Sequence, residues 1–281
     1  MGKTMIITDS GCDIPKNMLN DNIKVINYTI CIGEDDYLEE GKINKKVFSQ
    51  HMNAGLRISE INLKVDNILN ILNNLDEDCD EIVFIISSGM MYPNNEVVIR
   101  DAVLEYSFKH ITTRIAVIDS NTTSMALGFL VLDASKMAEM GCGFDEIVRY
   151  VNANKSRYRM DLVANDVTIL KEQRIINSRQ AKLVESNKKN YLISMSRFGI
   201  LRPIMKRSTD TEIKEIMIDR LIDDYSDYYA VVSSALNREA GNLVECIGES
   251  LDINPIDSIF GCSSTSFVGT DSISLCYKKK K

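Results

Sequence analysis

Hydroxyl and carboxylate side chains follow three apolar segments of this sequence and are its first candidates for chemistry. The segments end in Thr-Asp-Ser at 8–10, in two adjacent serines at 87–88 and in Asp-Ser at 119–120. Serine and threonine hydroxyls donate and accept hydrogen bonds, and a carboxylate can act as an acceptor or as a nucleophile. If the fold gathers these groups, they form a polar binding site or a phosphoryl-transfer site.

The elements that must position these groups alternate between strands and helices. Apolar runs predict strands at 4–10, 23–32, 80–88 and 114–120, and the run at 82–86 is typical of a strand buried on both faces. Apolar residues at helical spacing and capping residues predict helices at 14–22, 44–52, 65–75, 95–110, 124–141 and 144–158. This alternation predicts a parallel sheet covered by helices, in which the three polar strand ends meet at one edge.

Simpler roles compete with a binding site at these strand ends. Serine and aspartate often cap the helix that follows them, and Asp9 and Asp119 are expected to hold loop amides through hydrogen bonds. Phosphoryl transfer to Asp9 would call for a second aspartate two residues later, where Gly11 stands. That reaction is therefore disfavoured.

Composition excludes several classes of function. The chain has 281 residues, 44% of them hydrophobic, which is enough for two domains, and its net charge of −7 argues against binding nucleic acid or anionic lipid surfaces. No apolar run is long enough to span a membrane and no signal peptide is visible. Seven scattered cysteines and two histidines predict free thiols in a reducing cytoplasm, no zinc site and no Ser-His-Asp triad. The acidic segment 33–40 lacks the EF-hand pattern and is expected to be solvated.

The second half of the chain has a different order of predicted strands and helices. Segment 160–186 begins as a strand and becomes helical, 189–207 is broken around Gly199 and Pro203, and 210–226 and 237–251 are predicted helices. A strand is predicted at 228–236, and strand, turn and strand at 255–270. We expect an N-terminal parallel-sheet α/β domain at 1–158 and a C-terminal α+β domain at 159–281.

Five segments together resemble the DegV family of bacterial fatty-acid-binding proteins. "IITDSGCDIP" at 6–15 is similar to the family's V-T-D-S-x-x-D-L-P, and "DEIVFIISSG" at 80–89 to its strand followed by S-S-G. "VIDSNTTSMALGFLVLDASKMAEMG" at 117–141 resembles its D-S and the helix that follows. "LKEQRI" at 170–175 and "LRPIM" at 201–205 stand where the family has L-x-x-G-G-R-I and I-K-P-I-L. Their order and spacing extend the resemblance over nearly the whole chain.

The resemblance implies a two-domain DegV-like fold that holds one long-chain fatty acid between its domains. It further implies a carrier that presents the carboxylate to a separate fatty acid kinase and performs no chemistry itself. Neither a cofactor nor a metal is implied; the expected partners are the fatty acid and the kinase subunit.

The departures from the family pattern fall at the expected head-group site. The family's T-S-x-P is "ISEI" at 58–61, its L-S-G-T after S-S-G is "MMYP" at 90–93, and its G-x-H-x-G-P-G becomes "GCSSTSFVG" at 261–269. The G-G before the arginine is replaced by Glu172-Gln173. The resemblance and its departures predict ligand contacts at Ser59, Ser87, Ser88, Ser263, Ser264, Thr265 and Arg202, and a partner contact at Arg174.

Magnitudes favour continued lipid binding. Burying one methylene contributes about 0.8 kcal/mol, whereas a hydrogen bond to a charged group contributes about 1.5–3 kcal/mol net. The acyl tail therefore sets most of the affinity, and loss of one or two donors weakens binding without abolishing it. The alternatives are a DegV-like protein that has lost lipid and binds a partner or regulates, and a small-molecule enzyme at the same sheet edge.

Overall fold

The computed structural model describes residues 3–39, 44–56, 58–76, 79–164, 167–179, 190–208, 210–223, 229–237, 240–251 and 254–280. The strands are β1 (Thr4–Asp9), β2 (Ile23–Ile26), β3 (Thr29–Ile32), β4 (Asp35–Leu38), β5 (Glu60–Asn62), β6 (Glu81–Ile86), β7 (Arg114–Asp119), β8 (Tyr158–Ala164), β9 (Asn190–Met195), β10 (Leu201–Ser208), β11 (Tyr229–Ser233), β12 (Ile256–Ile259) and β13 (Ile273–Lys278). The α-helices are α2 (Lys45–Asn53), α3 (Val65–Leu72), α4 (Asn95–Ser107), α5 (Ser124–Glu139), α6 (Phe144–Asn154), α7 (Val167–Glu172), α9 (Asp210–Asp223), α10 (Ala240–Leu251) and α11 (Cys262–Val268). Short 3-10 turns are η1 (Ser10–Cys12), η2 (Lys16–Met18) and η3 (Lys155–Arg157).

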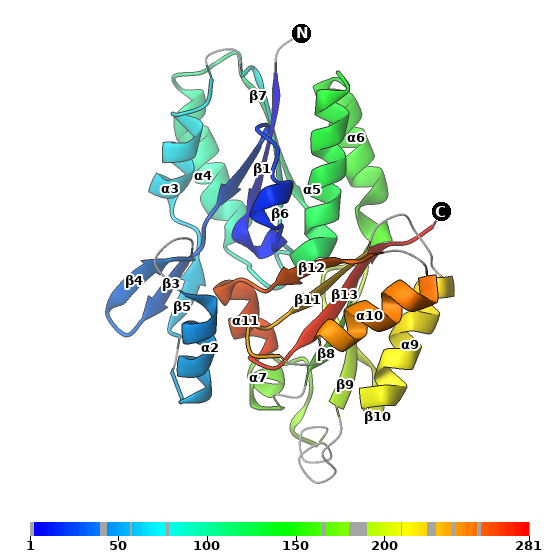
Figure 1. Ribbon diagram of the computed structural model, residues 1–281. Helices are drawn as coiled ribbons and strands as arrows, with labels where there is room; N and C mark the ends of the chain where they lie inside the picture. Colours follow the sequence, from blue (N-terminus) through cyan, green and yellow to red (C-terminus); the bar gives the residue numbers. More distant parts are fainter. Residues whose placement is uncertain are drawn as a thin grey trace.

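The N-terminal region contains the predicted parallel sheet, in the order β2-β1-β6-β7. Ile6 of β1 pairs with Ile23 on one side and with Val83 on the other. All residues of β1 are buried, as are all but the first of β6, because helices cover both faces of the sheet. Figure 1 shows α3 and α4 on one side of these strands and α5 and α6 on the other.

The apolar run 23–32 was predicted to be one strand, and this prediction is wrong. The chain leaves the parallel sheet after Ile26 and begins a separate three-stranded sheet, β4-β3-β5, at Thr29. The cause is Tyr28, whose backbone N–H donates to Ser10 Oγ at 3.0 Å and whose carbonyl accepts from the Glu39 N–H at 2.9 Å. The pattern stayed apolar across the break because Tyr28 is itself fully buried.

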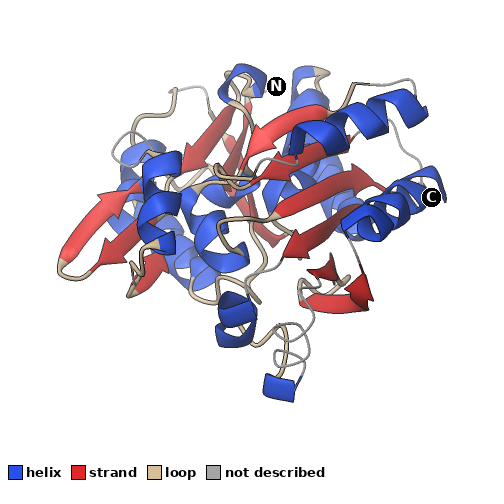
Figure 2. Ribbon diagram, turned by 60° about the horizontal axis from the view of Figure 1, so that its bottom comes forward, coloured by secondary structure: helices blue, strands red, loops and turns tan. Residues whose placement is uncertain are grey.

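The C-terminal region is built on a six-stranded mixed sheet, β10-β9-β8-β13-β11-β12, in which only β11 and β12 pair in parallel. Helices α9 and α10 contact each other and pack against β10 and β11, and α5 packs against β8 and β13. Figure 2 shows the strands in red with blue helices beside them. One buried cluster contains Ile6 and Phe84 of the first sheet together with Leu162 and Val232 of the second. The fold class is therefore as predicted, while the division at 158/159 stays a prediction because a continuous core crosses it.

Two further local predictions are wrong. Segment 14–22 forms only the short turn η2 where a helix was expected. Residues 262–268, expected to contain the turn and second strand of 255–270, form helix α11, because the buried side chains of Cys262, Thr265 and Val268 recur at helical spacing. Pro203 lies within β10, which pairs only with β9 and is therefore an edge strand that tolerates proline. The parts of the predicted helices and strands at 165–166, 180–186, 189, 224–226, 228 and 238–239 lie outside the described residues.

In the part of the chain that the structure describes, no helix combines the length and the apolar character needed to cross a bilayer.

Candidate functional site

The three polar strand ends do meet at the carboxyl edge of the parallel sheet. Ser87 donates its backbone N–H to Asp9 Oδ2 at 2.7 Å and its hydroxyl to Asp9 Oδ1 at 2.6 Å. Asp119 accepts from the Gly89 N–H at 3.0 Å and from the Asn121 N–H at 2.7 Å. Both aspartates thus hold loop amides, as expected, and the Ser87 hydroxyl is buried and donated to Asp9.

The second serine of the pair joins the two regions of the molecule. The Ser88 hydroxyl is fully buried, donates to the carbonyl of Gly199 at 3.0 Å and accepts from the Met90 N–H at 3.2 Å. Gly199 has φ +75°, and a Cβ atom there would lie 2.0 Å from Ser88 Oγ. Only glycine fits this approach, so Ser88 fixes the turn between β9 and β10 to the edge of the first sheet.

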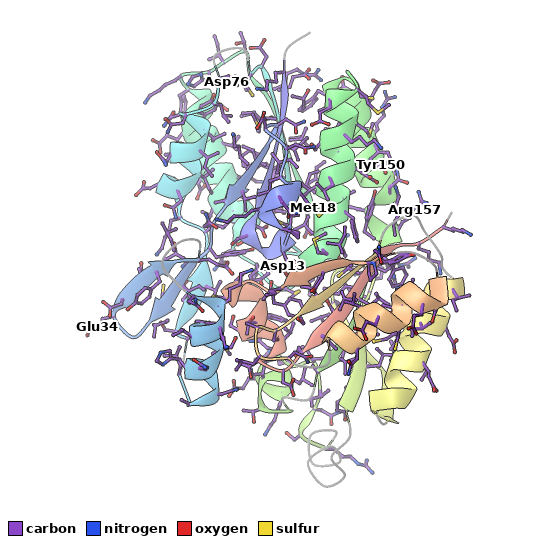
Figure 3. All side chains as sticks on the ribbon, viewed as in Figure 1. Asp13, Met18, Glu34, Asp76, Tyr150 and Arg157 are labelled. Atoms are coloured by element: carbon purple, nitrogen blue, oxygen red, sulfur yellow. The ribbon has the colours of Figure 1, made fainter. Side chains whose placement is uncertain are left out.

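The serines at the start of α11 bind two carboxylates of the N-terminal region. Ser263 donates its backbone N–H and hydroxyl to Glu39 Oε1 at 2.9 and 3.0 Å, and Ser10 donates to Glu39 Oε2 at 2.6 Å. Asp13 accepts from the Gly261 N–H at 2.7 Å and from the Ser264 hydroxyl at 3.2 Å. We call Asp13, Glu39, Ser263 and Ser264 the carboxylate clasp; Asp13 is labelled in Figure 3. Thr265 is buried directly after it.

The clasp residues Asp13 and Glu39 are largely buried, and burial changes the acidity of their carboxylates. Burial raises the pKa of Asp13 to about 6, against the opposing effect of the Lys45 charge. Burial likewise raises the pKa of Glu39, although three hydrogen bonds from Ser10 and Ser263 oppose the shift. Asp9, which binds Ser87, also has its pKa raised to about 6 by burial. Each of these carboxylates therefore takes up its proton at a higher pH in the folded protein than in the unfolded chain.

A groove of about 480 Å³ opens between the two regions, and we call it the inter-region groove. Its walls come from the end of α2, residues 55–56 and 58–61, Met91 and Tyr92, and from α7 and α11. Helices α2, α7 and α11 lie next to one another in Figure 1, and α11 contacts both of the others. The apolar lining residues are Met52, Leu56, Ile58, Ile61, Met91, Tyr92, Ile169 and Phe267, and the polar ones are Ser59, Glu60, Thr168, Glu172, Gln173 and Ser266.

The groove has an apolar interior and a polar rim. Met91 and Tyr92 are buried, whereas Ser59, Glu60 and Glu172 are exposed. The Tyr92 ring stacks on Tyr28 with centroids 4.8 Å apart and lies 6.1 Å from the ring of Phe267. Its hydroxyl is buried and makes no hydrogen bond to a described residue; Ser263 is near enough to affect its pKa, but donates its own hydroxyl to Glu39. Burial raises the pKa of Tyr92 well above its ordinary value.

A second cavity, also of about 480 Å³, lies beside the clasp. Glu39 and Asp13 form part of its wall, together with Lys45, which donates to the carbonyl of Ile259 at 2.8 Å, and apolar residues such as Leu19. It too is lined from both regions, since Ile259 is the last residue of β12 in the mixed sheet.

The predicted ligand contacts do not form one cluster. Ser59 lines the groove and donates its hydroxyl to the Cys31 carbonyl at 2.9 Å. Ser87 and Ser88 lie at the sheet edge, and Ser263 and Ser264 lie in the clasp. Arg202 is exposed on edge strand β10, paired with Ser194, outside the groove lining. Arg174 follows α7 with φ +56° and is also exposed.

Several residues of the site were not expected from the sequence. Asp13 was noted only as part of the motif at 6–15, and Glu172-Gln173 only as a departure from the family pattern at 170–175. Glu39 lay in a segment expected to be solvated, and nothing in the local pattern marks Tyr92 or Phe267. Three substituted positions, Ile58, Ile61 and Met91, line the groove and make it more apolar than the family pattern would.

The described residues provide no set of side chains suited to binding a metal ion. No group of three or more His, Cys, Asp or Glu residues is placed to hold a metal ion within the described ranges. All seven cysteines are free thiols, and burial raises the pKa of Cys262 beside the clasp to about 12. That thiol is therefore a poor nucleophile.

Comparison with known proteins shows which family has this sequence pattern and fold. Residues 3–280 match the profile of a family described as uncharacterised proteins of the DegV family. The chain belongs to the DegV family. A DegV domain-containing protein of Clostridium acetobutylicum is 24% identical over 284 residues, which cover 98% of each chain.

Solved structures of DegV proteins share the fold of this DegV chain. One from Eubacterium eligens, loaded with heptadecanoic acid, has a TM-score of 0.85 at 18% identity, over 99% of this chain and 100% of its own. The fatty acid kinase B3 protein of Streptococcus pneumoniae, loaded with linoleic acid, has a TM-score of 0.81 at 18% identity, over 99% of this chain and 100% of its own. At this identity the likeness establishes the fold alone.

Proposed function

We propose that this DegV protein binds one long-chain fatty acid, with the acyl chain in the inter-region groove. The observation that carries the proposal is the groove itself, whose apolar interior is formed jointly by residues 56, 58, 61 and Met91 of one region and by α7 and α11 of the other. Its volume of about 480 Å³ falls within the range of small-molecule sites. Proteins of the same fold contain fatty acids in their solved structures.

The energetics support an acyl ligand. Each buried methylene contributes about 0.8 kcal/mol, so about eight of them in the groove contribute roughly 6 kcal/mol before the cost of association. Isoleucine at 58 and 61 and methionine at 91 add apolar wall where the family pattern has polar side chains or proline. The acyl chain, rather than the head group, thus provides the affinity.

We further propose that the protein acts as a carrier for a separate fatty acid kinase in the cytoplasm and catalyses no reaction itself. The likeness to a kinase B3 protein supports this role. The exposed side chains of Arg174, beside the groove residue Gln173, and of Arg202 are our candidates for the contact with the kinase. Adding ATP and fatty acid to the isolated chain should yield no acyl phosphate; turnover would overturn the carrier role.

Lipid extraction tests the binding proposal. Protein purified from bacteria should release a long-chain acid detectable by mass spectrometry, and delipidated protein should rebind it. Ile58→Glu, which puts a charge on the groove wall, should abolish rebinding. Leu104→Glu, a similar change on the exposed face of α4, should leave it intact. No extracted lipid and no binding on titration would refute the proposal.

One observation favours a second candidate, a DegV-like protein that has lost lipid and binds a protein partner. The hydroxyls of Ser88, Ser263 and Ser264 all donate to carbonyl or carboxylate oxygens of the chain itself. A ligand head group at these positions would have to displace those contacts. An empty groove in the extraction experiment, together with a negative titration, would select this candidate.

A further inference from the structure

The two serines that line the inter-region groove offer a ligand only their lone pairs. Ser59 Oγ donates to the carbonyl of Cys31 at 2.9 Å, and Ser266 Oγ donates to the carbonyl of Ser263 at 2.6 Å. A serine hydroxyl has one hydrogen and two lone pairs. Because each hydrogen is already donated within the protein, both side chains act toward a ligand as acceptors.

The charged side chains that the structure describes in the groove lining are negative on both sides. Glu60 of β5 and Glu172 of α7 stand on its rim, one from each region, and none of the described lining residues is Lys, Arg or His. Tyr92 is the remaining titratable lining residue, and behind it Glu39, Asp9 and Asp13 contribute further negative charge. Helices α2 and α11 contribute only uncharged residues, Met52, Ser266 and Phe267.

A carboxylate would be poorly solvated in these surroundings. On leaving water it would lose several hydrogen bonds, and among the described lining side chains only Thr168 and Gln173 have exposed donors to replace them. An unpaired buried charge costs several kcal/mol, so a weak acid in such a site takes up a proton instead. A ligand O–H group suits these surroundings, because it can donate to the acceptors that the groove presents.

Resting on the proposed function, we infer that the groove holds its ligand with an uncharged, O–H-bearing head group. A fatty acid satisfies this in its protonated form, and a long-chain alcohol satisfies it at any pH. In both, the O–H donates to Ser59 Oγ or to Ser266 Oγ. The same groove then discriminates against the fatty acid anion.

The pH dependence of binding tests this inference. Palmitic acid and hexadecanol should be titrated into delipidated protein between about pH 6 and about pH 8. Because the protonated fraction of a carboxylic acid falls tenfold per pH unit well above its pKa, the apparent Kd of palmitic acid should rise about tenfold per unit. The Kd of hexadecanol should stay constant, which removes any general effect of pH on the groove.

Each outcome decides a different claim. A Kd for palmitic acid that is independent of pH, or lower at about pH 8, overturns the uncharged head group and leaves the binding function standing. Binding of hexadecanol alone supports the inference and identifies the neutral lipid as its source. If neither probe binds, the proposed function fails and the inference falls with it.

Rim variants provide a second readout. In the double variant Glu60→Gln/Glu172→Gln, palmitic acid should bind about threefold to tenfold more tightly at about pH 8, because two repelling charges are removed. Hexadecanol binding should not change. Both glutamates are exposed, so folding is retained, and Glu105→Gln on the exposed face of α4 is the matched control. An unchanged affinity for palmitic acid in the double variant would contradict the role of the rim charges.

Discussion

Replacing Asp13 by asparagine should stabilise this protein at alkaline pH and reverse sign in acid. Burial raises the pKa of Asp13 from an ordinary value of 3.8 to about 6. At about 1.4 kcal/mol per unit of pKa, keeping this carboxyl ionised in the folded state costs about 3 kcal/mol above pH 6. Asparagine is nearly isosteric, and it tolerates the left-handed backbone of Asp13, φ 50°.

The sign follows from proton binding. Between about pH 4 and about pH 6 the folded protein keeps the proton of Asp13 while the unfolded chain has lost it, so stability falls as the pH rises through this window. Above about pH 6 Asp13 is ionised in both the folded and the unfolded state, and the folded state carries the full cost of the buried charge. Below it both are protonated and the cost is absent.

The hydrogen bonds of Asp13 limit the gain. In the wild-type protein the Gly261 N–H lies 2.7 Å from Asp13 Oδ1, and the amide oxygen of the variant can accept the same hydrogen bond. The bond from the Ser264 hydroxyl must be rearranged, at a cost of about 1 kcal/mol. The net expectation is a free energy of unfolding about 2 kcal/mol above wild type at about pH 8, and about 1 kcal/mol below it at about pH 4.

Urea unfolding followed by circular dichroism at both pH values measures this difference. Asp21→Asn, the same change at an exposed position, should alter stability by less than about 0.5 kcal/mol at either pH. If Asp13→Asn is less stable than wild type by more than about 1 kcal/mol at about pH 8, the ionised carboxylate stabilises the clasp and the reasoning is wrong.

Three further substitutions test contacts elsewhere. Gly199→Ala should lower the free energy of unfolding by more than about 2 kcal/mol in thermal unfolding, because the added Cβ would clash with Ser88 Oγ and φ is +75°. Adding Ser88→Ala should recover part of this loss. If the effects of the two substitutions on stability are strictly additive, the clash is not the cause. Tyr92→Phe should be neutral or stabilise by about 1 kcal/mol, because the hydroxyl is buried without a partner, and a clear loss would show that it is hydrogen-bonded. Arg220→Leu should cost about 3 kcal/mol in urea unfolding by leaving the fully buried Asp161 carboxylate without its cation at 2.8 Å; a loss below about 1 kcal/mol would mean that Tyr277 suffices.

The amino-acid sequence alone determined the buried strands of the parallel sheet and where they end in polar groups. Alternation of apolar strands and helices was enough to predict the parallel sheet and the meeting of Asp9, Ser87 and Asp119 at its edge. It was enough because burial on both faces and the common direction of parallel strands are local consequences of the pattern. The break at Tyr28 escaped this reasoning because a buried side chain keeps the pattern apolar while the backbone changes sheets.

The partners of the polar groups were decided only by the tertiary structure. Ser88 meets Gly199 across 111 residues of sequence, and Ser263 meets Glu39 across 224. Hydrogen bonding depends on distances below about 3.5 Å, and no local pattern encodes which donor comes that close to which acceptor from the other region. The inter-region groove has the same origin, because each wall is an ordinary helix or loop until the packing of two sheets around α5 brings the walls together.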